Sequence, residues 1–183
     1  SRLITFGDDR QFRFWKTADG SLERSLALPE ELTGGDLFPD GHTAFAVHRE
    51  NAFALFDLIT GSITKTPISQ QTITGWAFDP SAGRFATASR EKWTRVWSTR
   101  TGEPLTPRLD HGGEVRWVDF SPDGKRIVTA GLTPEARVWD ASTGEQLFAP
   151  LRLGTKPLEV AHWSLDGRFI VARSDENMVR VWD

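Results

Sequence analysis

The stretch that decides the fold runs Gly113-Glu114-Val115-Arg116-Trp117-Val118-Asp119-Phe120-Ser121-Pro122-Asp123-Gly124, and Val138-Trp139-Asp140 and Ser142-Thr143-Gly144 follow it. Short β-branched and aromatic runs with a period of two, such as 115–120, predict antiparallel strands. In 121–124, Pro presets one dihedral and Gly accepts a positive φ, so a tight turn is expected. Further strands are predicted over 126–130, 136–140 and 146–151, with Pro150 suited to an edge strand. This unit is therefore expected to be a small sheet of four strands.

The same pattern recurs at a nearly constant spacing. The aromatic that closes the third strand recurs at intervals of 41, 41, 42 and 43 residues, at Trp15, Phe56, Trp97, Trp139 and Trp182. A small sheet with two apolar faces cannot bury both alone, so neighbouring units must stack on it. We expect an all-β repeat protein with units over approximately residues 1–28, 29–69, 70–110, 111–153 and 154–183.

These motifs carry a family resemblance. The run Phe-Ser-Pro-Asp-Gly (120–124), then Arg-Val-Trp-Asp (137–140) and Thr-Gly-Glu (143–145), resembles a repeat of the WD-repeat (WD40) β-propeller family. The resemblance implies a WD40-type β-propeller with about 4.4 four-stranded repeats of 41–43 residues. It also implies that His111, Thr129 and Trp139 form a structural hydrogen-bonded network. In the family an Asp completes this network; here that position is Thr133, so an incomplete network is expected.

The two ends of the chain duplicate strands. Residues 3–6, 12–16 and 23–28 supply the second, third and fourth strands of one unit, whereas 158–163, 169–173 and 178–182 supply the first three of another. The ends therefore cannot complete one shared sheet, and we expect a fragment of a larger, seven-bladed propeller. The alternative is strand pairing between two chains at these open ends.

Composition and charge exclude several classes of function. A formal net charge of -3 without a run of Lys or Arg argues against nucleic-acid binding. No apolar run is long enough for a membrane span and no signal peptide is evident, so we expect no membrane association and a cytoplasmic location. The chain has no Cys, which excludes disulfides and thiol chemistry.

Catalytic and metal-binding patterns are not evident in the sequence. The four His residues, His42, His48, His111 and His162, lack the short spacing of a metal pair. Turn carboxylates such as Asp123 and Asp166 recur with the repeat, whereas a general acid and base need unlike surroundings. We therefore predict no catalytic residues, no metal site and no cofactor.

Positions that differ between otherwise similar repeats are where a specific binding surface would be encoded. In the resembled family, the hairpin after the second strand and the connection into the first strand share the face that most often binds partners. This predicts a partner-binding face made of Asp8, Arg49, Arg90, Trp93, Arg116, Trp117, Leu132, Glu159 and Asp175. Trp93 is interpreted as an anchor, since exposed Trp and Arg contribute much interface energy; the alternative is that it packs between blades.

The sequence thus predicts a noncatalytic protein–protein interaction scaffold with an unidentified protein partner. Its repeats are similar to bacterial WD-repeat regions that are attached to signalling modules, which suggests that it belongs to a larger bacterial signalling protein. The alternative is a propeller enzyme or small-ligand-binding protein that uses the central channel, where Asp36, Asp119 and His162 share one position of the first strand.

Overall fold

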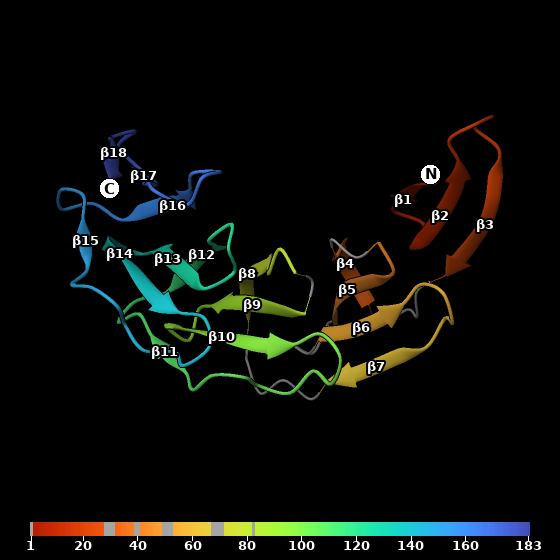
Figure 1. Ribbon diagram of the computed structural model, residues 1–183, viewed down its shortest axis with the longest axis horizontal. Helices are drawn as coiled ribbons and strands as arrows, with labels where there is room; N and C mark the ends of the chain where they lie inside the picture. Colours follow the sequence, from red (N-terminus) through yellow and green to blue (C-terminus); the bar gives the residue numbers. More distant parts are fainter. Residues whose placement is uncertain (1, 28–31, 39–40, 49–52, 67–71, 82) are drawn as a thin grey trace. The chain divides into compact units, whose positions relative to one another are not determined.

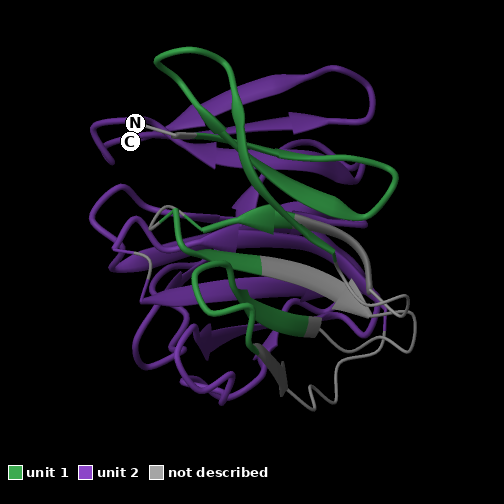
Figure 2. Cartoon of the chain, turned by 90° about the vertical axis from the view of Figure 1, so that its right-hand side faces the viewer, with its two compact units in different colours: residues 1–67 green, residues 68–183 purple. Residues whose placement is uncertain are grey.

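The computed structural model describes residues 2–27, 32–38, 41–48, 53–66, 72–81 and 83–183. These residues form 18 strands in five antiparallel sheets and no helix (Figure 1), which confirms the prediction of an all-β fold built from small sheets. In this part of the chain, no helix is long and apolar enough to cross a membrane. The chain divides into two compact units, residues 1–67 and 68–183 (Figure 2).

Unit 1 contains a three-stranded and a four-stranded sheet. Phe12 and Phe14 of the first sheet pack against Ala44, Ala54 and Phe56 of the second in one buried cluster. The strands, in sheet order, are β1 (Arg2–Phe6), β2 (Gln11–Lys16) and β3 (Leu22–Ala27), then β4 (Leu32–Leu37), β5 (Thr43–His48), β6 (Phe53–Asp57) and β7 (Ile63–Thr66).

Unit 2 contains three sheets, and in each the first three strands pair in sequence order. The β8–β11 sheet consists of β8 (Ile73–Phe78), β9 (Arg84–Ser89), β10 (Trp93–Ser98) and β11 (Leu109–Asp110). The β12–β15 sheet consists of β12 (Val115–Phe120), β13 (Arg126–Gly131), β14 (Thr133–Asp140) and β15 (Leu151–Arg152). The β16–β18 sheet consists of β16 (Leu158–Trp163), β17 (Ile170–Ser174) and β18 (Val179–Trp182).

The strand register repeats from sheet to sheet in unit 2. One residue from each of the first three strands lies directly opposite the next, and the set recurs as Phe78, Phe85 and Trp97, as Phe120, Ile127 and Trp139, and as Trp163, Ile170 and Trp182. The closing aromatics that recur in the sequence therefore hold the same register position in each of the three sheets. Residues of the three sheets can be matched to one another by this register.

The β12–β15 sheet is buried on both faces. Because side chains alternate along a strand, Ile127 and Trp139 join a core with Val96 of the β8–β11 sheet, whereas Val128 joins a second core with Ala172 of the β16–β18 sheet. Burial of one such branched aliphatic side chain contributes about 1.5–3 kcal/mol. Stacking on both sides therefore stabilises the middle sheet.

The fourth strand of the β12–β15 sheet differs from its prediction over 146–151. Gln146 pairs with Trp139, and regular pairing resumes only where Leu151 of β15 lies opposite Ala136. The residues between them include Pro150, which has no N–H to donate to a ladder. The predicted continuous strand is therefore interrupted. The third strand is longer than predicted, because β14 begins at Thr133 rather than at residue 136.

Gly131 allows the β13–β14 hairpin to lie against the chain that enters β12. A Cβ atom added at Gly131 would lie 2.0 Å from the Glu114 carbonyl oxygen and 2.9 Å from Val115 Cα. The Leu132 N–H donates to that same carbonyl at 2.8 Å. Only glycine fits here, and the contact holds Leu132 beside the start of the first strand.

We expect Gly131→Ala to lower the free energy of unfolding by more than about 2 kcal/mol, because the backbone of β12 must shift to admit the methyl group. Urea unfolding measures this change. Gly83→Ala is the matched control, since its added Cβ would meet Ser81 Oγ at an ordinary 3.6 Å. Equal losses of stability in the two variants would contradict this explanation.

Candidate functional site

The hairpins after the second strands lie beside the first strands, as a binding face built from both would require. In each sheet of unit 2, one backbone hydrogen bond joins the hairpin to the residues that precede or begin the first strand. The bonds run from Arg90 N–H to Thr72 O at 3.2 Å, from Leu132 N–H to Glu114 O at 2.8 Å, and from Asp175 N–H to Pro157 O at 3.2 Å. The repeat therefore places one variable hairpin residue at the same end of every sheet in this unit.

Two of the predicted residues, Arg90 and Arg116, meet at one carboxylate. Arg116 Nε lies 3.0 Å from Glu114 Oε1, and Arg90 Nε of the neighbouring sheet lies 3.9 Å from the same oxygen. The arginine side chains are 66% and 53% exposed, whereas that of Glu114 is 21% exposed. We call Arg90, Glu114, Arg116 and the exposed Leu132 the arginine rim. Its two guanidinium groups and one carboxylate leave an excess positive charge.

Other predicted residues lie apart from the arginine rim. On the β16–β18 sheet, Asp175 is exposed and Glu159 pairs with Arg173 at 2.7 Å. Asp8 belongs to unit 1, and Arg49 lies outside the described residues. The structure therefore brings together only part of the predicted face.

Neither tryptophan of the predicted face is exposed, so Trp93 is not the surface anchor that the sequence suggested. Trp93 is 6% exposed, and the Arg108 guanidinium lies 4.7 Å from the centre of its ring. Trp117 is partly buried against the core between its own sheet and the next, and the His162 ring lies edge-on to it at 4.8 Å. Burial of a large aromatic side chain stabilises the fold, which explains why these two tryptophans pack inside and do not lie on the surface as predicted.

Glu114 is the member of the arginine rim that the sequence prediction missed. It stands two residues before Arg116, and in an extended chain this spacing places two side chains on the same side. That signal could have paired Glu114 with Arg116. Its approach to Arg90, 24 positions earlier in the chain, depends on how neighbouring sheets stack and has no local signal.

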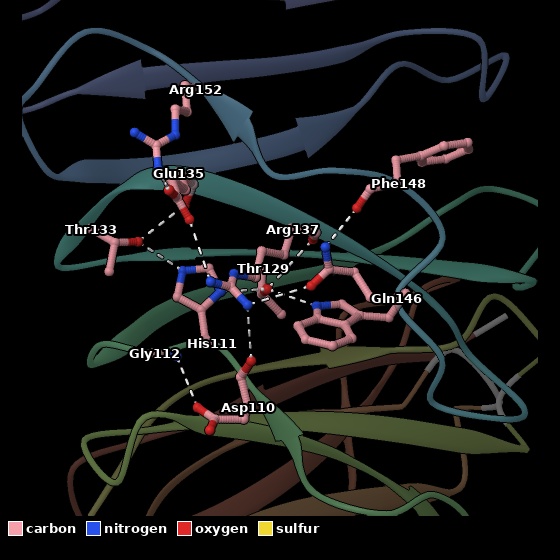
Figure 3. A network of polar contacts seen from close by, with 11 residues as sticks. Asp110, His111, Gly112, Thr129, Thr133, Glu135, Arg137, Gln146, Phe148 and Arg152 are labelled. Atoms are coloured by element: carbon pink, nitrogen blue, oxygen red, sulfur yellow. Dashed lines mark hydrogen bonds and ion pairs between the residues drawn. The ribbon is translucent and has the colours of Figure 1, made fainter.

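A largely buried hydrogen-bonded network connects His111, Thr129 and Thr133 (Figure 3), and the Trp139 indole joins it. His111 Nδ1 lies 2.9 Å from Thr129 Oγ1, and Trp139 Nε1–H donates to the same oxygen at 2.9 Å. His111 Nε2 lies 3.0 Å from Thr133 Oγ1. The network expected to be incomplete is therefore closed by the Thr133 hydroxyl, which stands where the resembled family has a carboxylate.

The network holds His111 in its neutral form. Burial of the ring, followed by the positive charge of Arg137, lowers the pKa of His111 from 6.5 to about 4. Glu135 and Asp110 act in the opposite direction, but more weakly. Because the Thr133 hydroxyl is neutral, it adds no negative charge that would raise the pKa of His111 against the effect of burial. The ring therefore binds no proton near neutral pH.

The predicted small-ligand alternative rests on the first strands. His162 Nδ1 lies 3.2 Å from Asp119 Oδ2, which also accepts the Trp163 N–H at 3.2 Å. The contact therefore joins β12 to β16, while Asp36 belongs to unit 1. Among the described residues, no group of three or more His, Cys, Asp or Glu could hold a metal ion.

The low pKa of His111 predicts a stability that depends on pH. Because the pKa of about 4 in the folded protein lies below 6.5, the unfolded chain binds more protons between these values. The stabilisation is complete above pH 6.5, is lost as the pH falls towards 4, and amounts to about 3 kcal/mol. Urea unfolding at pH 7.5, 5.5 and 4.5 measures this loss.

The control for this prediction is His111→Gln, which cannot titrate. We expect this variant to be less stable at pH 7.5 and to lose less stability than the wild type as the pH falls. Parallel pH profiles for the two proteins would show that another group is responsible.

Comparison with known proteins supports the family resemblance. The family model described as "WD domain, G-beta repeat" matches residues 102–140 and 156–183. These segments contain strands of the β12–β15 and β16–β18 sheets. No curated protein matches the chain. With two matched segments and a series of small antiparallel sheets in one repeated register, the chain contains WD40 repeats at residues 102–140 and 156–183.

Proposed function

We propose that the protein is a noncatalytic platform that binds a protein partner through the arginine rim. WD40 repeats commonly bind protein partners. The observation that carries the proposal is the pair Arg90 and Arg116, both more than half exposed, around the single carboxylate of Glu114. One carboxylate cannot satisfy the donors of two guanidinium groups, so donors remain for a partner.

The composition of the arginine rim favours an acidic partner segment. Arg recognises a carboxylate through paired N–H donors and is frequent among residues that dominate interface energy. The exposed Leu132 adds an apolar contact on the neighbouring hairpin. We therefore expect the partner to present Asp or Glu residues next to an apolar side chain.

From the sequence alone, we also predict that the chain belongs to a larger bacterial signalling protein and that this protein is cytoplasmic. A small-ligand-binding function is the second candidate, and the contact between His162 and Asp119 favours it.

Charge reversal tests the arginine rim. We expect the double substitution Arg90→Glu and Arg116→Glu to weaken partner binding at least tenfold, because it removes both cations from the surface. A partner captured by the wild-type chain is purified and its affinity measured by biolayer interferometry. Arg100→Glu with Lys125→Glu is the matched control, since both residues are exposed and lie in turns after β10 and β12.

The control should keep its affinity within twofold, and binding by the wild type should weaken with added salt. Equal affinities for the two double variants would exclude the arginine rim as the binding surface. A small molecule that raises the melting temperature of the wild type but not of His162→Asn would support the second candidate instead.

A further inference from the structure

A cavity of about 410 Å³ lies within unit 1, where the β1–β3 sheet packs against the β4–β7 sheet. Small-molecule sites commonly have volumes of roughly 300–1,000 Å³. The wall of the cavity includes Ile4, Phe14, Arg24, His42, Leu58 and Ile59. Because the arginine rim belongs to unit 2, the inference below does not rest on the proposed function.

The corresponding place in unit 2 is packed by the chain itself. Phe14 and Leu58, which line the cavity, correspond by their distance from the closing aromatic to Val96 and Ala141. Both counterparts are fully buried. Thr106 packs beside them at 4% exposure, and its Oγ1 accepts the Val96 N–H at 3.1 Å. The fourth-strand segment of the β8–β11 sheet therefore closes this place.

Two turn glycines show how far the two places differ. An added Cβ at Gly144 would lie 2.7 Å from Leu109 Cδ2 and 3.3 Å from Thr106 Cβ. Gly61 holds the same repeat position, yet among the described residues its added Cβ would meet only Leu26 Cδ1, at 3.8 Å. The turn that contains Gly61 is therefore packed less closely against the neighbouring sheet, and the cavity is left beside it.

A connection that is one residue shorter explains this opening. Leu26 and Leu109 are counterparts, because each lies opposite the third residue before the closing Trp of its sheet. Leu26 follows that Trp by 11 residues, whereas Leu109 follows it by 12. In the shorter connection regular pairing continues, and it places Arg24 opposite Phe14. A long cationic side chain thus stands where the β8–β11 sheet has a buried loop.

The Arg24 guanidinium is held in place at the wall of the cavity. It donates to the carbonyls of Leu58 and Ile59, the latter at 3.4 Å, and its Cζ lies 4.1 Å from the centre of the Phe14 ring. A guanidinium has more N–H donors than these two carbonyls use. Since the side chain is already ordered, it can bind an anion without the entropic cost of fixing a free arginine.

We propose that this cavity binds a small organic anion that has an apolar body and one carboxylate. Ile4 and the exposed Ile59 contact the apolar body, and Phe14 and Leu58 are buried behind it. The carboxylate accepts charge-assisted hydrogen bonds from Arg24, which are stronger than those between neutral groups. Both parts of the ligand therefore contribute to its affinity, and loss of either part weakens binding.

Ligand-observed fluorine NMR with 4-(4-fluorophenyl)butanoate and the 183-residue chain tests this proposal. We expect saturable binding of this acid. The alcohol 4-(4-fluorophenyl)butan-1-ol, which keeps the apolar body without the carboxylate, should bind at least tenfold more weakly. Arg24→Gln should weaken binding of the acid at least fivefold. Arg100→Gln is the matched control and should leave binding unchanged, since Arg100 is exposed in a turn of unit 2.

A second variant covers the case in which Arg24→Gln does not fold. Ile59 is 60% exposed, so Ile59→Asp should keep the fold while it places a competing carboxylate at the cavity. We expect this variant to bind the acid at least tenfold more weakly. Leu165→Asp, at a position of unit 2 that is 98% exposed, should bind it as the wild type does.

The arginine rim could also attract a carboxylate, and the double variant Arg90→Glu and Arg116→Glu distinguishes the two sites. This variant should bind the acid with unchanged affinity. Three results would overturn the proposal: no saturable binding at millimolar acid, equal affinities for the acid and the alcohol, or binding that is lost in the double variant and kept in Ile59→Asp.

Discussion

Packing of one small sheet against the next is the interaction on which unit 2 depends. The β12–β15 sheet presents Ile127 and Trp139 to one neighbour and Val128 to the other, and all three side chains are buried. A four-stranded sheet by itself would leave both apolar faces in water. The β16–β18 sheet has a neighbour in this unit on one face only, and Val179 and Val181 are exposed.

The same stacking decides where a binding surface can form. Since the faces of the middle sheet are covered, partners can reach mainly the strand ends and hairpins. Gly131 lets the β13–β14 hairpin touch the Glu114 backbone, and stacking then brings Arg90 of the neighbouring sheet to the Glu114 carboxylate. The arginine rim is therefore built by one local contact and one contact between sheets.

Much of the fold could be predicted because it repeats locally. Turn glycines at one repeat position, Gly20, Gly61, Gly102 and Gly144, all have a positive φ, as a tight turn requires. Contacts between distant residues could not be predicted in this way. The Thr133 hydroxyl reaches His111 only because of the hairpin geometry, and Trp93 is buried although its repeat position suggested a surface. The site is therefore less predictable than the fold, since it depends on differences between repeats.

The sheets differ in one hydrogen bond of the closing Trp, which joins two strands of the same sheet. The closing Trp donates its indole N–H to a Thr hydroxyl in three sheets, as Trp15 to Thr5 at 2.9 Å, Trp97 to Thr87 at 2.8 Å and Trp139 to Thr129 at 2.9 Å. In the β16–β18 sheet the register places Ala172 where these sheets have Thr. Ala172 has no hydroxyl, so Trp182 lacks this intrasheet bond. Trp182 packs against the core that this sheet shares with the β12–β15 sheet, so its burial comes from the neighbouring sheet and not from a bond within its own.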